Sequence, residues 1–212
     1  KMAGTLDVIS GGRFDLGIGA GWKRDEWEAY GYGFPETRQR LAQLRDGLEV
    51  ITRMLAGGAQ DHATFEGEHA SVRNAINWPK GLQAPRIPIM VGGNGPEVTW
   101  RLAARFADEL NLDGLSPAEL RDALPVIRSR CEEIGRDPAT LRLSLHAWWG
   151  EGDWSRAGDG RIAYLMQLAD LGLHRVIGLL QASAASDEAL IALAEDASAA
   201  GVELSLETAA AR

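Results

Sequence analysis

Short apolar segments alternate with longer amphipathic segments along most of this 212-residue chain, and this order constrains the fold more than any other feature. Each short segment has the length of a buried strand. Each long segment repeats its apolar positions every three or four residues, as a helix does. Repeated strand–helix units build a parallel sheet with helices packed outside it. The sequence therefore predicts an α/β fold with five strands, at residues 14–19, 87–91, 109–112, 141–147 and 175–180.

Several of the expected helices have clear boundaries. Ser116-Pro117-Ala118-Glu119 combines an N-cap serine, a proline at the first helical position and a capping-box glutamate, and Gly135 ends the helix that follows. The segment Glu36–Ala56 carries one apolar stripe and stops at Gly57-Gly58. Further helices are expected from Pro96 with Val98, Leu102 and Phe106 inward, around Ile162, Leu165, Met166 and Ala169, and from Ser186 to Gly201 with Leu190, Leu193 and Ala197 inward.

Two regions depart from this alternation. Residues 57–86 are predicted to be a polar, irregular insertion, with a small hairpin tip at Phe65-Glu66-Gly67-Glu68 and prolines at 79 and 85. Residues 5–12 are expected to be the end of a preceding helix with a glycine stop. A domain that opens at the end of a helix is expected to have lost its beginning.

Composition narrows the functional classes. The formal net charge of −8 argues against nonspecific nucleic-acid or anionic-membrane binding. No apolar run approaches the roughly 20 residues of a membrane helix, and residues 1–10 lack the apolar core of a signal peptide. A single cysteine, Cys131, excludes an internal disulfide and a cysteine-based zinc site, and His62 and His69 lack metal-ligand spacing. We expect a cytoplasmic protein that binds a small molecule and no metal.

The first candidate site is the glycine loop Gly17-Ile18-Gly19-Ala20-Gly21-Trp22. It approximates the dinucleotide fingerprint G-x-G-x-x-G, but the third glycine falls one residue early and a polar, aromatic segment follows in place of an apolar helix. Three interpretations stand: a dinucleotide site, a structural strand-to-helix turn, or a loop whose backbone lets a flat ring approach closely.

The second candidate site is the loop Gly92-Gly93-Asn94-Gly95, between an expected strand and an expected helix. Unpaired N–H groups and the dipole at a helix N-terminus attract anions, so this geometry favours a phosphate. A P-loop is excluded, because no Gly-Lys-Ser/Thr follows. Glu97 is expected to face away from the site, and a purely structural turn stays as the alternative.

Other polar residues have a structural interpretation beside a functional one. His146, next to Trp148 and Trp149 in an expected strand, either faces a pocket and moves a proton or is only hydrogen-bonded in place. The two tryptophans should point to opposite sides, because strand side chains alternate. We expect Cys131 in the core, His62 and His69 in solvent, and residues 23–28 on a solvated face.

Residues 5–14 and 16–22 together resemble the central signature of the luciferase-like monooxygenase superfamily, and most of all its branch that uses the deazaflavin coenzyme F420. The likeness continues in order through Gly67-Glu68-His69, residues 79–83, 88–93 and 103–109, and extends from about Thr5 to Leu206. No single motif decides the resemblance; the ordered series does.

The resemblance implies a TIM (β/α)8 barrel, of which this chain covers roughly strands 4 to 8, with an insertion between strands 4 and 5. Residues 1–212 would be a single partial α/β-barrel domain with 57–86 as the insertion segment, and three N-terminal units would be absent. A complete barrel takes about 250 residues, which agrees with this expectation. The open barrel would be a homo-oligomer or would be completed by the missing N-terminal segment.

The resemblance also implies where the cofactor lies. The cofactor ring would border Gly19, Ala20, Gly21 and Trp22, and the phosphate-bearing tail would sit at Gly92, Gly93, Asn94 and Gly95. Some deazaflavin-dependent sugar-phosphate dehydrogenases carry a catalytic glutamate where this chain has Trp22, and an asparagine where it has Asp25. These departures argue against sugar-phosphate oxidation and favour a flatter, more apolar substrate.

The resulting hypothesis is an oxidoreductase that transfers hydride between reduced coenzyme F420 and a small organic substrate, with catalytic residues that the sequence leaves unknown. A first alternative is an FMN-dependent monooxygenase with a separate reductase. An alternative of another class is a non-catalytic barrel fragment or partner-binding paralogue, because an open arc of strands exposes sheet edges that need a cover.

Overall fold

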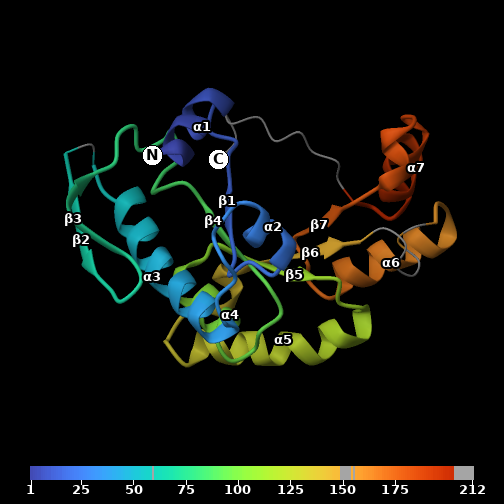
Figure 1. Ribbon diagram of the computed structural model, residues 1–212. Helices are drawn as coiled ribbons and strands as arrows, with labels where there is room; N and C mark the ends of the chain where they lie inside the picture. Colours follow the sequence, from blue (N-terminus) through green and yellow to red (C-terminus); the bar gives the residue numbers. More distant parts are fainter. Residues whose placement is uncertain (59, 149–153, 155, 203–212) are drawn as a thin grey trace.

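The computed structural model describes residues 1–58, 60–148, 154 and 156–202. Within these residues, five parallel strands form one sheet in the order β1-β4-β5-β6-β7 (Figure 1). All five strands coincide with predicted segments, so the predicted parallel α/β sheet is confirmed. They are β1 (Leu16–Ile18), β4 (Ile89–Gly92), β5 (Glu109–Asp113), β6 (Arg142–Ala147) and β7 (Arg175–Gly178).

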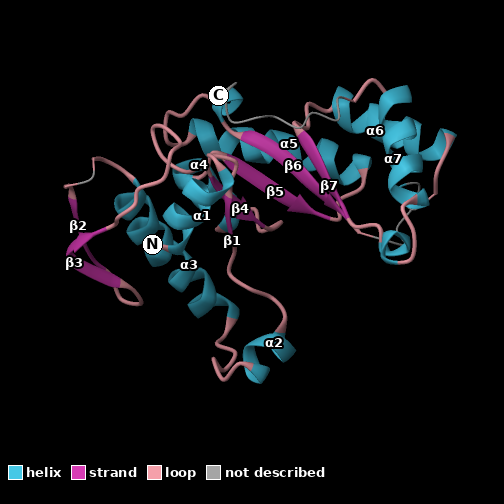
Figure 2. Cartoon of the chain, turned by 90° about the horizontal axis from the view of Figure 1, so that it is seen from above, coloured by secondary structure: helices cyan, strands magenta, loops and turns pink. Residues whose placement is uncertain are grey.

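The helices follow one another around the outer side of the sheet, from α3 through α4 and α5 to α6, each in contact with the next, as Figures 1 and 2 show. The α5 capping box is present as predicted: Oγ of Ser116 accepts from the Glu119 backbone N–H, and the Glu119 carboxylate accepts from the Ser116 N–H. The α-helices are α1 (Met2–Ser10), α2 (Arg24–Ala29), α3 (Thr37–Leu55), α4 (Thr99–Phe106), α5 (Pro117–Glu132), α6 (Asp159–Asp170) and α7 (Glu188–Ala199); 3-10 turns cover Pro138–Thr140 and Gln181–Ala184.

The two faces of the sheet differ in chemistry. The outer face packs fully buried aliphatic side chains, such as Val91, Leu110 and Leu145, against the helices. Cys131 of α5 belongs to this core as expected, and burial raises the pKa of its thiol. The inner face is polar, because alternate residues of β5 and the β6 residues aligned with them carry polar groups. These aligned pairs are Glu109 with Arg142, Asn111 with Ser144, and Asp113 with His146.

An ion-pair network crosses the inner face from one edge strand to the other. Arg175, on β7, donates from Nε to Oε1 of Glu109 at 2.8 Å and from an Nη to Oδ2 of Asp15 at 2.9 Å. Asp15 immediately precedes β1, the opposite edge of the sheet. These contacts satisfy the buried Glu109 carboxylate and connect the two edges of the sheet.

The start of α4 corrects the sequence analysis. The helix begins at Thr99, and Pro96 lies in the turn before it, not at the first helical position. The N–H of Trp100 donates to the carbonyl of Gly95, and its indole Nε1 donates to the carbonyl of Gly93 at 3.1 Å. The glycine loop is therefore folded over the first turn, Trp100 is buried, and Val98 is 40% exposed instead of facing the core.

Four apolar residues of the expected helices are exposed, because the helices are rotated slightly or end earlier than expected. In α6, Leu165 and Leu168 are buried, whereas Met166 and Ala169 are exposed. Leu190 of α7 and Ile134, which lies beyond the end of α5, are also exposed.

The beginning of the chain agrees with expectation: α1 ends at Gly11, whose φ of 68° is the left-handed conformation of a glycine stop.

The insertion is more regular than predicted. Residues 57–86 contain an antiparallel hairpin of β2 (His62–Glu66) and β3 (Ser71–Ile76), which packs against α3 (Figure 1). Its turn includes Gly67, which lies within the predicted tip at residues 65–68, and Ala63 is buried. His62 is exposed as expected, but the side chain of His69 is only 19% exposed, so the expectation that it is solvated is wrong.

A buried carboxylate attaches this hairpin to α3. Oδ2 of Asp46 accepts from the backbone N–H of His69 at 2.9 Å, and Oδ1 accepts from Nε of Arg45 at 3.1 Å. The hydrogen bond from His69, supported by Arg45, holds the pKa of Asp46 below its ordinary value of 3.8, although burial by itself would raise that pKa.

Among the described helices, none is long and apolar enough to cross a membrane.

The lowered pKa of Asp46 predicts a pH-dependent contribution to stability. A carboxyl group whose pKa is lower in the folded state stabilises above its unfolded pKa, and that stabilisation is lost as the pH falls through the folded value. Asp46→Asn should therefore lower the free energy of unfolding at pH 7, and the deficit should shrink below about pH 4. Urea unfolding at pH 7 and pH 3 measures both values, with the exposed Asp170→Asn as control. A deficit of equal size at both pH values would contradict this account.

Candidate functional site

The two glycine loops lie side by side at the carboxyl ends of neighbouring strands. Strand β1 pairs in parallel with β4, with Ile18 aligned to Val91, so residues 19–22 and 92–95 emerge at the same edge. A Cβ added to Gly19 would lie 3.5 Å from the carbonyl oxygen of Gly92. The carboxyl edge of parallel strands is where α/β proteins bind their ligands. The structure thus brings the two sequence-predicted loops together.

Backbone N–H groups in and after the second loop are available at this edge. Within the described chain, the N–H groups of Asn94, Gly95 and residues 97–99 donate to no backbone or side-chain acceptor. Gly93 differs, because its N–H donates to the carbonyl of Asn111 at 3.0 Å. The unpaired amides expected from sequence are therefore present, but Gly93 does not supply one of them.

Each glycine of this loop occupies its position for a different physical reason. Gly93 has a φ of 130°, which side-chain-bearing residues rarely adopt, and a Cβ on Gly95 would lie 2.9 Å from Oγ1 of Thr99. Internal geometry explains these two. A Cβ on Gly92 would meet nothing within 4 Å. Gly92 is aligned with Asn111, so it borders the open inner side of the sheet.

The side chain of Asn94 fixes the loop to the next strand. Nδ2 donates to the carbonyl of Asp113 at 2.7 Å, and Oδ1 accepts from the N–H of Asp113 at 2.9 Å. The Asn94 side chain is thus used to position the loop, while its backbone N–H stays available. Glu97 is paired with Arg130 of α5 at 3.0 Å and with Arg101, which agrees with the expectation that it faces away from the loop.

Asp113 is also the centre of a cluster that sequence analysis did not foresee. Oδ1 of Asp113 accepts from Nε1 of Trp148 at 2.7 Å and lies 3.1 Å from Nδ1 of His146. The rings of His146 and Trp148 are 4.5 Å apart between centroids. A polar residue at every second position of β5 was the available signal for this cluster. Trp149, the other tryptophan of the sequence analysis, lies outside the described residues.

The first loop adds a second tryptophan to the same edge. Trp22 is 70% exposed, and its ring centroid lies 6.5 Å from that of Trp148 in an edge-to-face arrangement. Gly21 has a φ of 73°, a Cβ there would lie 2.6 Å from Nε1 of Trp27, and its carbonyl accepts from Arg40. The close approach at Gly21 is thus made by the protein's own indole ring.

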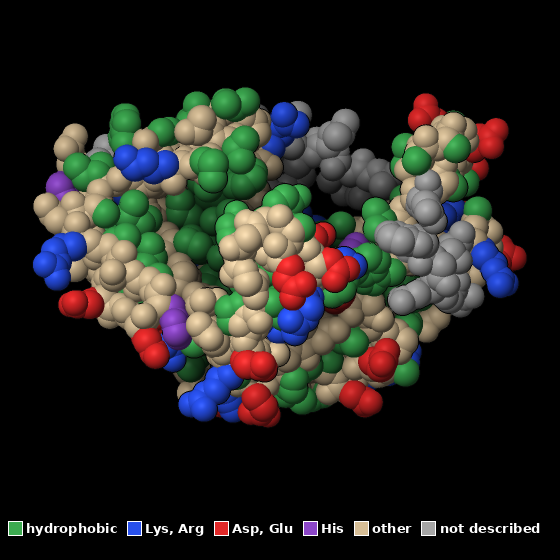
Figure 3. Space-filling view, in the orientation of Figure 1, with side chains coloured by type: hydrophobic (Ala, Val, Ile, Leu, Met, Phe, Trp, Pro, Cys, Tyr) green, Lys and Arg blue, Asp and Glu red, His purple; other side chains and the backbone are tan. Residues whose placement is uncertain are grey.

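The segment after this loop excludes a dinucleotide fingerprint. In place of a long apolar helix there is α2 (Arg24–Ala29), which has no buried residue. Figure 3 shows acidic and basic side chains over this helix, whose acidic residues are Asp25, Glu26 and Glu28. The expectation of a solvated face at residues 23–28 is confirmed.

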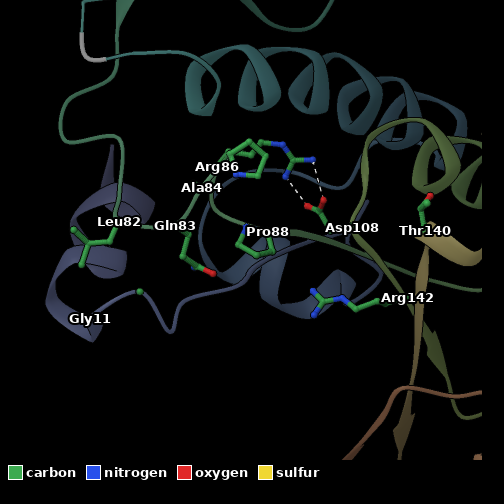
Figure 4. Close-up of a pocket in the computed structure, with 11 residues that line it drawn as sticks. Gly11, Leu82, Gln83, Ala84, Arg86, Pro88, Asp108, Thr140 and Arg142 are labelled. Atoms are coloured by element: carbon green, nitrogen blue, oxygen red, sulfur yellow. Dashed lines mark hydrogen bonds and ion pairs between the residues drawn. The ribbon is translucent and has the colours of Figure 1, made fainter. Parts of the chain in front are cut away.

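A cavity of about 770 Å³ lies at the amino ends of the strands, opposite the two glycine loops. Its lining includes Pro88 before β4, Asp108 before β5 and Arg142 at the start of β6, and Figure 4 shows Arg86 and Asp108 directed toward each other. Arg86 pairs with Asp108 at 2.5 Å. Residues at the amino end of barrel strands serve stability, whereas the chemistry occupies the carboxyl end. We therefore place the candidate site at the carboxyl edge.

Comparison with known sequences identifies related proteins. The profile of the luciferase-like monooxygenase family matches residues 1–152. An uncharacterized protein of Mycobacterium tuberculosis is 39% identical over 185 residues, which are 80% of this chain and 63% of that protein. An F420-dependent glucose-6-phosphate dehydrogenase of Kineococcus radiotolerans is 34% identical over 143 residues, 66% of this chain and 40% of that protein. The chain therefore spans less than two thirds of the length of these relatives.

Solved structures share the fold. An F420-dependent secondary alcohol dehydrogenase, in complex with an F420-acetone adduct, superposes with a TM-score of 0.70 at 16% identity, over 83% of this chain and 66% of that one. A coenzyme F420-dependent tetrahydromethanopterin reductase from Methanopyrus kandleri superposes with a TM-score of 0.66 at 20% identity, over 83% of this chain and 71% of that one. At these identities, the likeness shows the fold alone.

The contacts of Asn94 predict how the second loop responds to mutation. Asn94→Ala removes both hydrogen bonds to the Asp113 backbone, so the free energy of unfolding should fall by about 1–3 kcal/mol. Hydrogen exchange of the Gly93 N–H, which donates to the carbonyl of Asn111, should become faster, because the loop loses its attachment to β5. Chemical denaturation and exchange mass spectrometry measure the two effects, with the exposed Gln39→Ala of α3 as control. Unchanged exchange of this N–H would show that Asn94 does not hold the loop.

Proposed function

The chain belongs to the luciferase-like monooxygenase family, and from this premise we propose that it is the cofactor-binding part of an oxidoreductase that uses coenzyme F420. The reaction would be hydride transfer between the reduced coenzyme and a small organic substrate. One observation carries the proposal: five backbone amides that have no acceptor among the described residues lie beside an open glycine position, at the edge of the sheet where both predicted loops meet.

The arrangement suits a phosphate-bearing cofactor. The amides of Asn94, Gly95 and residues 97–99 precede or begin α4, so they combine free donors with the positive end of a helix dipole. The absence of a side chain at Gly92 leaves room on the inner side of the sheet. Gly19, Ala20, Gly21 and Trp22 would border the ring, with the exposed indole of Trp22 as its apolar neighbour. When bound, the reduced deazaflavin supplies a hydride.

The choice of coenzyme F420 over FMN rests on relatives. A curated relative with a stated activity is an F420-dependent dehydrogenase, and both solved structures described above are named as F420-dependent enzymes. An FMN-dependent monooxygenase with a separate reductase is the competing function, and the titration below distinguishes the two. The non-catalytic fragment is a third outcome of the same experiment.

We further propose that the five strands are the fourth to eighth strands of a (β/α)8 barrel, in a single partial domain with residues 57–86 as the insertion between the fourth and fifth strands. In the described sheet, β1 and β7 are the edges, and each has a neighbour on one side only. Open edges expose unpaired N–H and C=O groups, which a preceding segment or a partner copy of this chain would cover.

The cofactor assignment predicts that a side chain at Gly92 weakens F420 binding. The position has open space and an ordinary φ, so Gly92→Val should leave the fold intact while its methyl groups fill the cofactor space. We expect at least about a tenfold rise in the dissociation constant, equivalent to about 1.4 kcal/mol. Fluorescence titration of the full-length protein with F420 and with FMN measures both affinities. Gly47→Ala is the matched control, because Gly47 of α3 is also surrounded by open space.

Each outcome of this titration discriminates between the functions. Tight binding of FMN with no binding of F420 would replace the proposed reaction with the monooxygenase. Binding of neither cofactor would favour the non-catalytic fragment. F420 binding that Gly92→Val leaves unchanged would reject the loop as the site while preserving the cofactor.

A further inference from the structure

We propose that Nε2 of His146 exchanges a proton with the oxygen of an uncharged ketone or secondary alcohol, and that Asp113 is the positioning residue that orients the imidazole. The inference rests on the proposed function, because a hydride acceptor of this class needs a proton partner. It goes beyond that function by naming the residue that moves the proton and the chemical class of the substrate.

The first observation is the pairing of the two side chains at the ends of their strands. Asp113 and His146 are aligned partners on β5 and β6, and Oδ1 of Asp113 lies 3.1 Å from Nδ1 of His146. An ionised carboxylate only accepts hydrogen bonds, so Nδ1 carries the proton in this contact and Nε2 is left with its lone pair in the neutral ring. Within the described part of the chain, Nε2 has no hydrogen-bond partner.

The second observation is that the ring and the carboxylate are both held in place. Nε1 of Trp148 donates to the same Oδ1 of Asp113 at 2.7 Å, and the Trp148 ring lies against the imidazole. The backbone of Asp113 is fixed by Asn94, and the N–H of Gly114 donates to the carbonyl of His146 at 3.0 Å. A preorganised donor of this kind does not have to be ordered when a substrate binds.

The structural interpretation of His146 accounts for only part of these facts. A histidine that serves packing alone is satisfied by its partners and can lie anywhere on the sheet. The side chain of His146 is 25% exposed, its Nε2 has no hydrogen-bond partner among the described residues, and it lies at the same carboxyl edge of the sheet as both glycine loops. The contact between Trp22 and Trp148 connects this residue directly to the first loop.

His146 exchanges one proton with the substrate oxygen in either direction of the reaction. A carbonyl carbon that gains a hydride forms a C–H bond, its C=O π bond breaks, and the electron pair moves to the oxygen. That oxygen takes the proton from Nε2 of the His146 imidazolium, so an O–H bond forms and the N–H bond breaks. Water then restores the proton to the imidazole. In the oxidation of an alcohol, neutral Nε2 accepts the hydroxyl proton while the carbon gives up the hydride.

The surroundings define the substrate class. The indoles of Trp22 and Trp148 offer apolar surface for a flat group. The Asp113 carboxylate, half exposed beside the imidazole, disfavours a phosphorylated or carboxylated substrate by like-charge repulsion. An aromatic ketone such as acetophenone, with 1-phenylethanol as its alcohol, matches both features.

The first test does not depend on turnover. Diethyl pyrocarbonate acylates accessible unprotonated imidazole nitrogens, and peptide mass spectrometry locates the product. We expect His146 of the full-length protein to be acylated, and F420 with acetophenone, each at about ten times its dissociation constant, to slow this reaction about tenfold. His62 is an internal control, because its Nδ1 is likewise bonded, to the carbonyl of Asn74, and it lies in the hairpin. Equal acylation of His146 with and without ligands would overturn the proposal.

The second test measures the proton step. His146→Ala should lower kcat for acetophenone reduction by about 10²- to 10⁴-fold while leaving F420 affinity unchanged, and added imidazole should restore part of the rate. Asp113→Asn should lower kcat more than it changes KM, and His62→Gln should change neither. Circular dichroism and the F420 titration check that the variants are folded.

The outcomes separate this inference from the proposed function. Failure of the wild-type protein to bind F420 would reject the proposed function itself. F420 binding without acetophenone or 1-phenylethanol turnover would reject the substrate class. Turnover that His146→Ala retains to within about twofold would reject His146 as the proton carrier while preserving the oxidoreductase.

Discussion

The structure depends on the parallel register of its five strands. Because β1 pairs with β4 instead of with its neighbours in sequence, the loops that follow these strands meet, although more than 70 residues separate Gly19 from Gly92. The same register places Asp113 opposite His146 at the ends of β5 and β6. In a parallel sheet all carboxyl ends lie along one edge, so one pairing pattern collects both glycine loops, the carboxylate and the imidazole.

The sheet divides its two tasks between its two faces. The outer face buries Val91, Leu110 and Leu145 against the helices and supplies hydrophobic stability. The inner face carries Glu109 and Arg175 in a network that reaches the opposite edge through Asp15. Barrel interiors are usually filled by branched apolar side chains. The inner face of this sheet is polar instead, so its groups need specific partners, and these partners connect the two edge strands.

Local signals predicted the elements well and the details of the site less well. The capping box at Ser116, the glycine stop at Gly11 and the strands were read correctly, because each depends on residues close in sequence. The start of α4 was misplaced, because the indole of Trp100 binds the Gly93 carbonyl and the loop folds over the helix. The hairpin in residues 57–86 was only partly foreseen, because its strands are stabilised by packing on α3.

By itself, the sequence determined the order of strands and helices, the two glycine loops and the family resemblance, since all three depend on local composition and on the spacing of residues. Only the tertiary structure decided which amides of the second loop lack an acceptor among the described residues, that Gly93 gives its N–H to Asn111, and that Asp113 contacts the imidazole of His146. These facts depend on hydrogen bonds between strand ends that are far apart in the chain. Such bonds require a particular register and loop path, and the periodicity of a sequence does not specify either.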